Sequence, residues 1–171
     1  MASTCITDLD KWEQALSTED AASKLQQYTT AINATTDMAE RKRLLREMLD
    51  YAIVEAGIPV KGVSILGLKN ANAGARGDWM ILEEELISGN NVQLNKILDR
   101  VFHEGGHSLA NRMSSAERER VFSGGNRFYF PGAVNSQHYR TQPQEVYSHH
   151  MGNRGKALGL KLMPNEKPHD K

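Results

Sequence analysis

The strongest constraint on this chain lies in residues 103–107, which read His-Glu-Gly-Gly-His. Apolar residues recur around this segment at intervals of three and four, the spacing that buries one face of an α-helix. They are Leu94, Ile97, Leu98, Val101, Leu109 and Met113. We therefore predict a helix that opens at Asn90 or Asn91 and carries both histidines.

The two histidines are spaced to bind a metal ion. Residues four apart on a helix lie one above the other, so the imidazoles of His103 and His107 can reach the same cation. A typical catalytic zinc site has three protein ligands and a water molecule. Glu104 would lie beside the cation, where its carboxylate can take a proton from a water and pass it to a leaving amine. The motif predicts a Zn²⁺ site, and the alternative treats both histidines as ordinary surface or packing residues.

A third metal ligand must come from another part of the chain. Glu145 is the first choice, on a helix predicted to begin near Pro143. His149 follows one turn later on the same face, where it can hydrogen-bond Glu145 or compete with it for the metal. His138 and His150 are further alternatives for the third ligand. Glu145 can also be explained as a solvated surface residue that binds no metal.

The two glycines inside the motif need an explanation of their own. Gly105 and Gly106 each weaken a helix by about 1 kcal/mol relative to alanine. Without side chains, the helix can either approach another backbone closely or leave space for a substrate near the metal. Alanine substitutions, followed by measurements of stability and turnover, separate these two hypotheses.

Helices are predicted over most of the N-terminal third of the chain. Residues 7–32 carry apolar side chains at helical spacing with a polar interruption, which fits two short helices or a broken one. A longer helix is expected from a cap at Thr36 or Asp37 to Gly57. Its outer face is interpreted as solvated rather than as a basic binding patch. That face carries Arg41, Lys42, Arg43, Arg46 and Glu47.

Two strands are predicted next, over residues 60–68 and 79–87. The loop between them is rich in glycine and asparagine, so we expect an antiparallel pair. Glu83, Glu84 and Glu85 lie in the second strand, where neighbouring side chains face opposite sides and cannot all bind one cation. These glutamates are better explained as charges that protect an exposed strand edge.

Length and composition place these elements in a single domain. A chain of 171 residues can bury one modest core. We divide it into a helical part at 1–58, a sheet and metal-site core at 59–159, and a frayed tail at 160–171. Acidic and basic residues number 21 each, so no overall field attracts nucleic acid or an anionic membrane. No apolar run approaches the roughly 20 residues that cross a bilayer.

The first residues and the cysteine content indicate a compartment. The chain starts without the charged and apolar regions of a secretory signal, so we expect a cytoplasmic protein or one delivered by a leaderless route. Its lone cysteine, Cys5, cannot form an internal disulfide, which fits a reducing environment.

HEGGH at 103–107, followed by HYRTQPQEVYSHHM at 138–151, resembles the gluzincin class of zinc metallopeptidases. The resemblance is to the catalytic domain of anthrax lethal factor and to related toxin or effector peptidases. It implies a zincin-like α+β domain in which a later helix supplies Glu145 as the third zinc ligand beside the two histidines. It also implies that Glu104 is the general base and that Tyr139 stabilises the oxyanion, although Tyr139 has an alternative role as a buried aromatic.

By this resemblance the chain would hydrolyse a peptide bond, as a bacterial or phage toxin or effector. The protein or peptide substrate would lie along the strand predicted at residues 79–87. The chain departs from the family at His149, because the family often has an acidic residue one turn after its ligand glutamate. We therefore expect a different environment around the metal. The alternative functions are a non-catalytic zinc-binding module and an interaction protein with an accidental motif.

Overall fold

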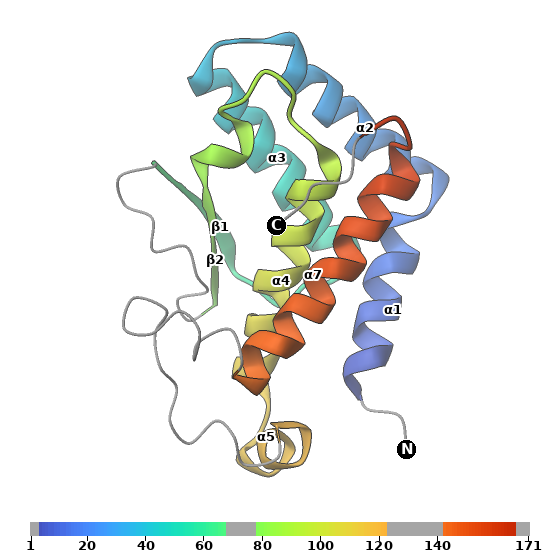
Figure 1. Cartoon of the computed structure of the whole chain (residues 1–171), viewed down its shortest axis with the longest axis vertical. Helices are drawn as coiled ribbons and strands as arrows, with labels where there is room; N and C mark the ends of the chain where they lie inside the picture. Colours follow the sequence, from blue (N-terminus) through green and yellow to red (C-terminus); the bar gives the residue numbers. More distant parts are fainter. Residues whose placement is uncertain (1–3, 68–77, 123–141, 167–171) are drawn as a thin grey trace.

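The computed structural model describes residues 4–67, 78–122 and 142–166 (Figure 1). Within these ranges the fold is α+β and mostly helical, with six α-helices, one 3-10 helix and a sheet of two strands. The expected α+β class is confirmed at this level. A search of the same ranges for a helix that is both long and apolar enough to cross a membrane found none.

Three helices form the N-terminal part of the fold. They are α1 (Thr4–Leu16), α2 (Glu19–Ala34) and α3 (Met38–Ala56). The predicted interruption within residues 7–32 is confirmed, because Thr18 caps α2 by accepting a hydrogen bond from the Ala21 N–H. Asp37 caps α3 in the same way, and Gly57 ends α3 in the left-handed conformation that glycine adopts without strain.

The basic face of α3 differs from the prediction at Arg41, which is buried. Its guanidinium donates hydrogen bonds to the main-chain carbonyls of Ile87, Gly89 and Thr35. These carbonyls replace water around the charged group, so its burial is tolerated. Assigning Arg41 to the solvated face was therefore wrong, because helical periodicity does not reveal acceptors supplied by a distant segment.

The sheet consists of β1 (Gly62–Leu66) and β2 (Trp79–Glu83), which pair in parallel. The antiparallel prediction was wrong. A two-residue turn would force antiparallel pairing, but the connection through residues 67–78 matches the roughly dozen residues that a parallel crossover needs. Gly62 lies opposite Trp79, whose ring occupies the space that a side chain at Gly62 would need.

The second strand ends at Glu83, and the 3-10 helix η2 (Glu84–Ile87) replaces the rest of the predicted strand. The three neighbouring glutamates diverge as expected. Glu83 lies 3.8 Å from Arg100, Glu84 lies 2.8 Å from Lys42, and Glu85 is exposed. They form no common cation site.

Two long helices, α4 (Leu94–Arg112) and α7 (Pro143–Leu162), lie side by side and cross the middle of the molecule (Figure 1). The helix α4 begins slightly later than predicted, and the short helix α5 (Ser115–Phe122) follows it. Three glycines of α7 face α4. A Cβ at Gly152, Gly155 or Gly159 would overlap Asp99, Leu98 or Asn95 of α4. The two helices therefore approach each other closely because these side chains are missing.

The C-terminal segment is anchored as far as Glu166. Its carboxylate accepts hydrogen bonds from the main-chain N–H groups of Leu94 and Asn95 and from the Asn95 amide. Glu166 thus caps the start of α4, where a negative charge also interacts favourably with the helix dipole. The prediction of a frayed tail after Gly159 is wrong for residues 160–166, and residues 167–171 lie outside the described ranges.

Candidate metal centre

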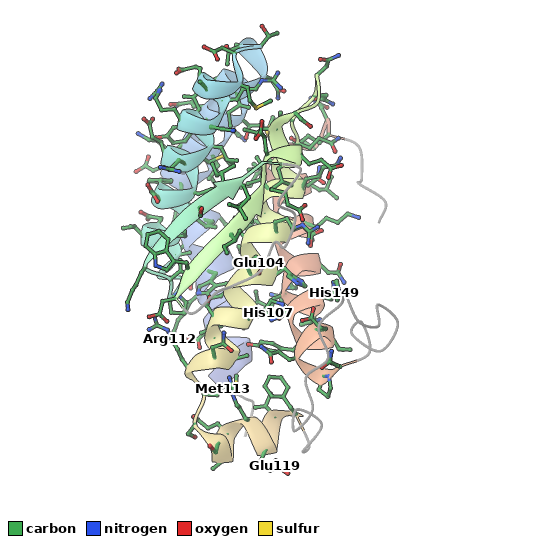
Figure 2. All side chains as sticks on the ribbon, turned by 90° about the vertical axis from the view of Figure 1, so that its left-hand side faces the viewer. Glu104, His107, Arg112, Met113, Glu119 and His149 are labelled. Atoms are coloured by element: carbon green, nitrogen blue, oxygen red, sulfur yellow. The ribbon has the colours of Figure 1, made fainter. Side chains whose placement is uncertain are left out.

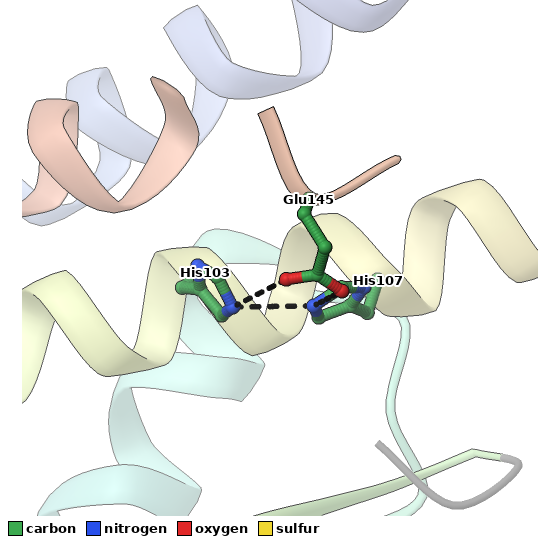
Figure 3. A group of neighbouring side chains, drawn as sticks. All are labelled: His103, His107 and Glu145. Atoms are coloured by element: carbon green, nitrogen blue, oxygen red, sulfur yellow. Dashed lines mark hydrogen bonds and ion pairs between the residues drawn. The ribbon is translucent and has the colours of Figure 1, made fainter. Parts of the chain in front are cut away.

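His103, His107 and Glu145 converge between α4 and α7 (Figure 3). The two histidines share one face of α4, and Glu145 reaches across them from the first turn of α7. Their Nε2 atoms are 3.1 Å apart. Glu145 Oε1 lies 3.4 Å from Nε2 of His107, and Oε2 lies 3.8 Å from Nε2 of His103. The structure thus brings together the three residues that were predicted as ligands.

The ligand atoms of the three residues are close enough to share one cation. The two Nε2 atoms are 3.1 Å apart, and each faces a different oxygen of Glu145, at 3.4 Å for His107 and 3.8 Å for His103. One ligand atom from each residue lies within 4.8 Å of the others, and ligands about 2.0–2.1 Å from a tetrahedral zinc lie about 3.3 Å apart, so a bound ion would draw them slightly closer. Two imidazoles and one carboxylate suit zinc or another first-row transition metal better than calcium or magnesium, which prefer oxygen ligands. The group can hold a metal ion.

Burial strengthens the case for a cation. His103, His107 and Glu145 are 5%, 7% and 0% exposed. A carboxylate removed from water costs several kcal/mol unless a charge or hydrogen bonds compensate it. A divalent ion between the three side chains would provide that compensation.

The motif glycines explain how α4 fits this position. A Cβ at Gly105 would lie 2.9 Å from the Trp12 ring of α1 and 3.1 Å from Ile58. A Cβ at Gly106 would lie 2.9 Å from Met151 Sδ and 3.2 Å from the main chain of Ser148, both in α7. Other parts of the protein occupy the space around both glycines, which supports close packing over room for substrate.

Glu104 directly follows His103 on α4, the helix that also carries His107 (Figure 2). Its Oε1 is 4.0 Å from His103 Nε2, and its buried Oε2 has no hydrogen-bond partner in the described part of the chain. Burial raises the pKa of Glu104 to about 7, and Glu145 adds to this effect, whereas His107 and Arg100 oppose it. A carboxylate with such a pKa can both accept and release a proton near neutrality.

His107 is held from α7 through both of its ring nitrogens. Nε2 faces Glu145, and Nδ1 lies 3.4 Å from the side-chain amide of Gln144. Burial lowers the pKa of His107, but the hydrogen bond to Glu145 and the charges of Glu104 and Glu145 outweigh it, so this pKa is raised overall. Gln144 was not predicted from the sequence, although its place directly before Glu145 was a usable signal.

The structure does not place the other candidate third ligands among the grouped ligand atoms. His149 packs its ring against His103, with the ring centroids 4.7 Å apart, and approaches the site from α7 (Figure 2). His150 is exposed. Among the described residues, the group with suitably placed ligand atoms comprises only the two motif histidines and Glu145. His138 and Tyr139 lie outside the described ranges, so the proposed oxyanion role of Tyr139 stays a prediction.

The strand β2 runs alongside the motif in the opposite direction to α4. Asp78, just before β2, lies 3.7 Å from Arg112 at the end of α4. Glu83, at the end of β2, lies 3.8 Å from Arg100 nearer the start of α4. Within the described ranges β2 pairs with β1 alone. The strand therefore passes the metal centre with one edge that no described strand covers.

Comparisons with protein-family models, with curated proteins and with solved structures found no match to this chain. Its function is therefore inferred from the chemistry and geometry of the site.

Proposed function

We propose that this protein is a zinc-dependent metallopeptidase of the gluzincin type, with a zincin-like arrangement of its active-site helices. One observation carries the proposal. The buried carboxylate of Glu104 lies beside a buried His103, His107 and Glu145 group whose ligand atoms are close enough to share one ion. A metal site with an adjacent proton acceptor is the combination that hydrolysis of a peptide bond requires.

The chain's residues would divide the reaction between them. A bound zinc ion would polarise the carbonyl group of the scissile bond and acidify a water molecule. Glu104 takes a proton from that water as its oxygen bonds to the carbonyl carbon, then donates the proton to the nitrogen as the C–N bond breaks. The products are a carboxylic acid and an amine, and the acid then gives its proton to the amine to leave a carboxylate and an ammonium group. Tyr139 would stabilise the negative charge on the carbonyl oxygen.

The substrate would be a protein or peptide in extended conformation along β2. Main-chain groups at a strand edge bind an extended peptide through regular hydrogen bonds. The course of β2 beside α4 supports this placement, because a peptide added to that strand would run past the motif. A role as a bacterial or phage toxin or effector follows from the family resemblance and belongs to the same proposal.

The burial of the ligands supports a second candidate function. A structural zinc site has no open coordination position, and a metal at this place would join α4 to α7 without any turnover. Glu104 separates the two candidates, because hydrolysis requires it as a proton acceptor.

The test combines metal analysis with Glu104→Gln. Protein purified without added zinc should contain one equivalent of zinc by elemental mass spectrometry and should cleave members of a peptide library. Glu104→Gln should keep the zinc and lower the cleavage rate by at least about 100-fold, in line with the loss of a general base. The exposed Glu85→Gln serves as a matched control and should cleave like the wild type. Zinc binding without cleavage in the wild type would support the structural site, and cleavage by Glu104→Gln would reject the mechanism.

A further inference from the structure

One imidazole of the metal centre is contacted on both sides by consecutive residues of α7. Glu145 faces Nε2 of His107 at 3.4 Å, and the side-chain nitrogen Nε2 of Gln144 lies 3.4 Å from Nδ1 of the same ring. Consecutive helix residues point about 100° apart. The side chains of Gln144 and Glu145 can therefore lie on opposite sides of the ring.

The contact at Nδ1 determines which form of the imidazole is present. A neutral imidazole carries one hydrogen, on either Nδ1 or Nε2. A ring that gives its Nε2 lone pair to a metal must carry that hydrogen on Nδ1, and ligating histidines nearly always donate it to a carbonyl or carboxylate. The structure places the NH₂ group of the Gln144 amide at Nδ1, and a half-turn of the amide would present its acceptor oxygen there instead.

We propose that Gln144 is a positioning residue that holds His107 in the tautomer and ring orientation required for metal binding. In the metal-loaded protein its amide oxygen accepts the hydrogen bond from Nδ1–H of His107. The inference rests on the metal centre of the proposed function and does not require peptide hydrolysis.

The ring of His103 lies against the ring of His149, and Nδ1 of His107 meets the Gln144 amide. An amide carries no net charge, so Gln144 can satisfy Nδ1–H without adding a further carboxylate to a site that already contains Glu104 and Glu145. Replacing Gln144 should therefore change the affinity for the metal and the hydrogen bonding of Nδ1 of His107.

The first test measures zinc affinity by competition with a chromophoric chelator. Gln144→Met keeps the length of the side chain and removes the hydrogen-bonding amide, and we expect its zinc dissociation constant to rise 10- to 100-fold. Gln144→Glu restores an acceptor for Nδ1–H and should bind zinc at least as tightly as the wild type. Gln14→Met, on the exposed surface of α1, makes the same chemical change away from the site and should leave affinity unchanged.

A second measurement detects the hydrogen on Nδ1 of His107 directly. Nitrogen-15 NMR of the zinc-loaded wild type should show Nδ1 of His107 carrying the hydrogen, and Gln144→Met should alter the Nδ1 signal of His107 more than that of His103. Thermal unfolding of the metal-free proteins should give similar midpoints for wild type and Gln144→Met, which separates positioning from a general packing role.

The inference is overturned if Gln144→Met binds zinc within twofold of the wild type, or if Nδ1 of His107 lacks a hydrogen in the zinc-loaded protein. It is also overturned if the wild type binds no zinc at all. A wild type that binds zinc but cleaves no peptide rejects the peptidase proposal alone, and the Gln144 comparison then still decides the positioning role.

Discussion

The N-terminal helices and the α4–α7 pair are held together in different ways. In the first region, α1 to α3 bury large aliphatic side chains against one another. These include Leu16, Leu25, Ile32, Leu45, Met48 and Leu49, all fully buried. In the second region, α7 approaches α4 mainly through small or polar residues, together with Met151. These include Glu145, Ser148, Gly152, Gly155 and Gly159.

This difference separates stability from positioning. Burial of a large aliphatic side chain contributes roughly 1.5–3 kcal/mol, so the N-terminal core can supply much of the folding free energy. The glycine contacts between α4 and α7 bury little side-chain surface, but they fix the distance between the helices. That distance brings Glu145 of α7 to the two histidines of α4. We therefore expect substitutions in the first region to change stability, and substitutions in the second to change metal binding as well.

The largest change in stability is expected in the N-terminal core. Leu45→Ala removes a fully buried side chain and should lower the free energy of unfolding by about 3 kcal/mol, within the usual range for such cavities. Because α3 supplies none of the three ligands, the folded variant should bind zinc as tightly as the wild type. Urea denaturation and chelator competition measure the two quantities, and a large loss of zinc affinity would remove the distinction between the regions.

Zinc itself should stabilise the protein by a comparable amount. A ligand that binds the native state alone, at a free concentration of 100 times its Kd, adds about 2.7 kcal/mol. Calorimetry with zinc and with a chelator should therefore show a clearly higher Tm for the loaded protein. In Glu145→Gln this difference should shrink, whereas an unchanged difference would place the bound zinc elsewhere.

A smaller loss of stability, coupled to metal binding, is expected from Gly155→Ala. The added methyl group would overlap the main chain of Leu98 and the ring of Phe102. Alanine favours the helix by about 1 kcal/mol, but the overlap should outweigh this and leave a net loss of about 2 kcal/mol. Zinc affinity should fall as α7 moves away from α4. Gly89→Ala is the matched control, because a Cβ there meets only the Asn91 nitrogen at 4.0 Å.

The smallest effect concerns the cap on α4. Glu166→Ala removes the carboxylate that accepts hydrogen bonds at Leu94 and Asn95 and should cost about 1 kcal/mol, as other helix caps do. The exposed Glu119→Ala should change stability by no more than about 0.5 kcal/mol. Equal unfolding curves for the two variants would show that Glu166 contributes nothing as a cap.

The features predicted correctly from the sequence depend on local signals. The cap, which was expected at Thr36 or Asp37 and is Asp37, the end of α3 near Gly57 and the helix begun by Pro143 are each specified by a few neighbouring residues. The spacing of His103 and His107 is equally local, because a helix places residues four apart on one face. Glu145 was placed in a separate helix by its own pattern and by a family resemblance, and the structure brings it to the histidines.

The features missed from the sequence depend on contacts between distant segments. The parallel pairing of β1 and β2, the burial of Arg41 and the cap from Glu166 each involve residues that are far apart in the chain. The contact of Gln144 with His107 is of the same kind. Periodicity and propensity describe single elements, so they cannot give the direction in which strands pair or the acceptor that a buried arginine finds.

The central claim is that His103, His107 and Glu145 bind one zinc ion between α4 and α7. The most direct measurement is anomalous X-ray diffraction at the zinc absorption edge from crystals of the zinc-loaded protein. We expect one strong peak about 2.0–2.1 Å from Nε2 of each histidine and about 2.0–2.2 Å from a carboxylate oxygen of Glu145. A Glu145 carboxylate directed away from both imidazoles, or zinc bound elsewhere on the chain, would contradict the claim.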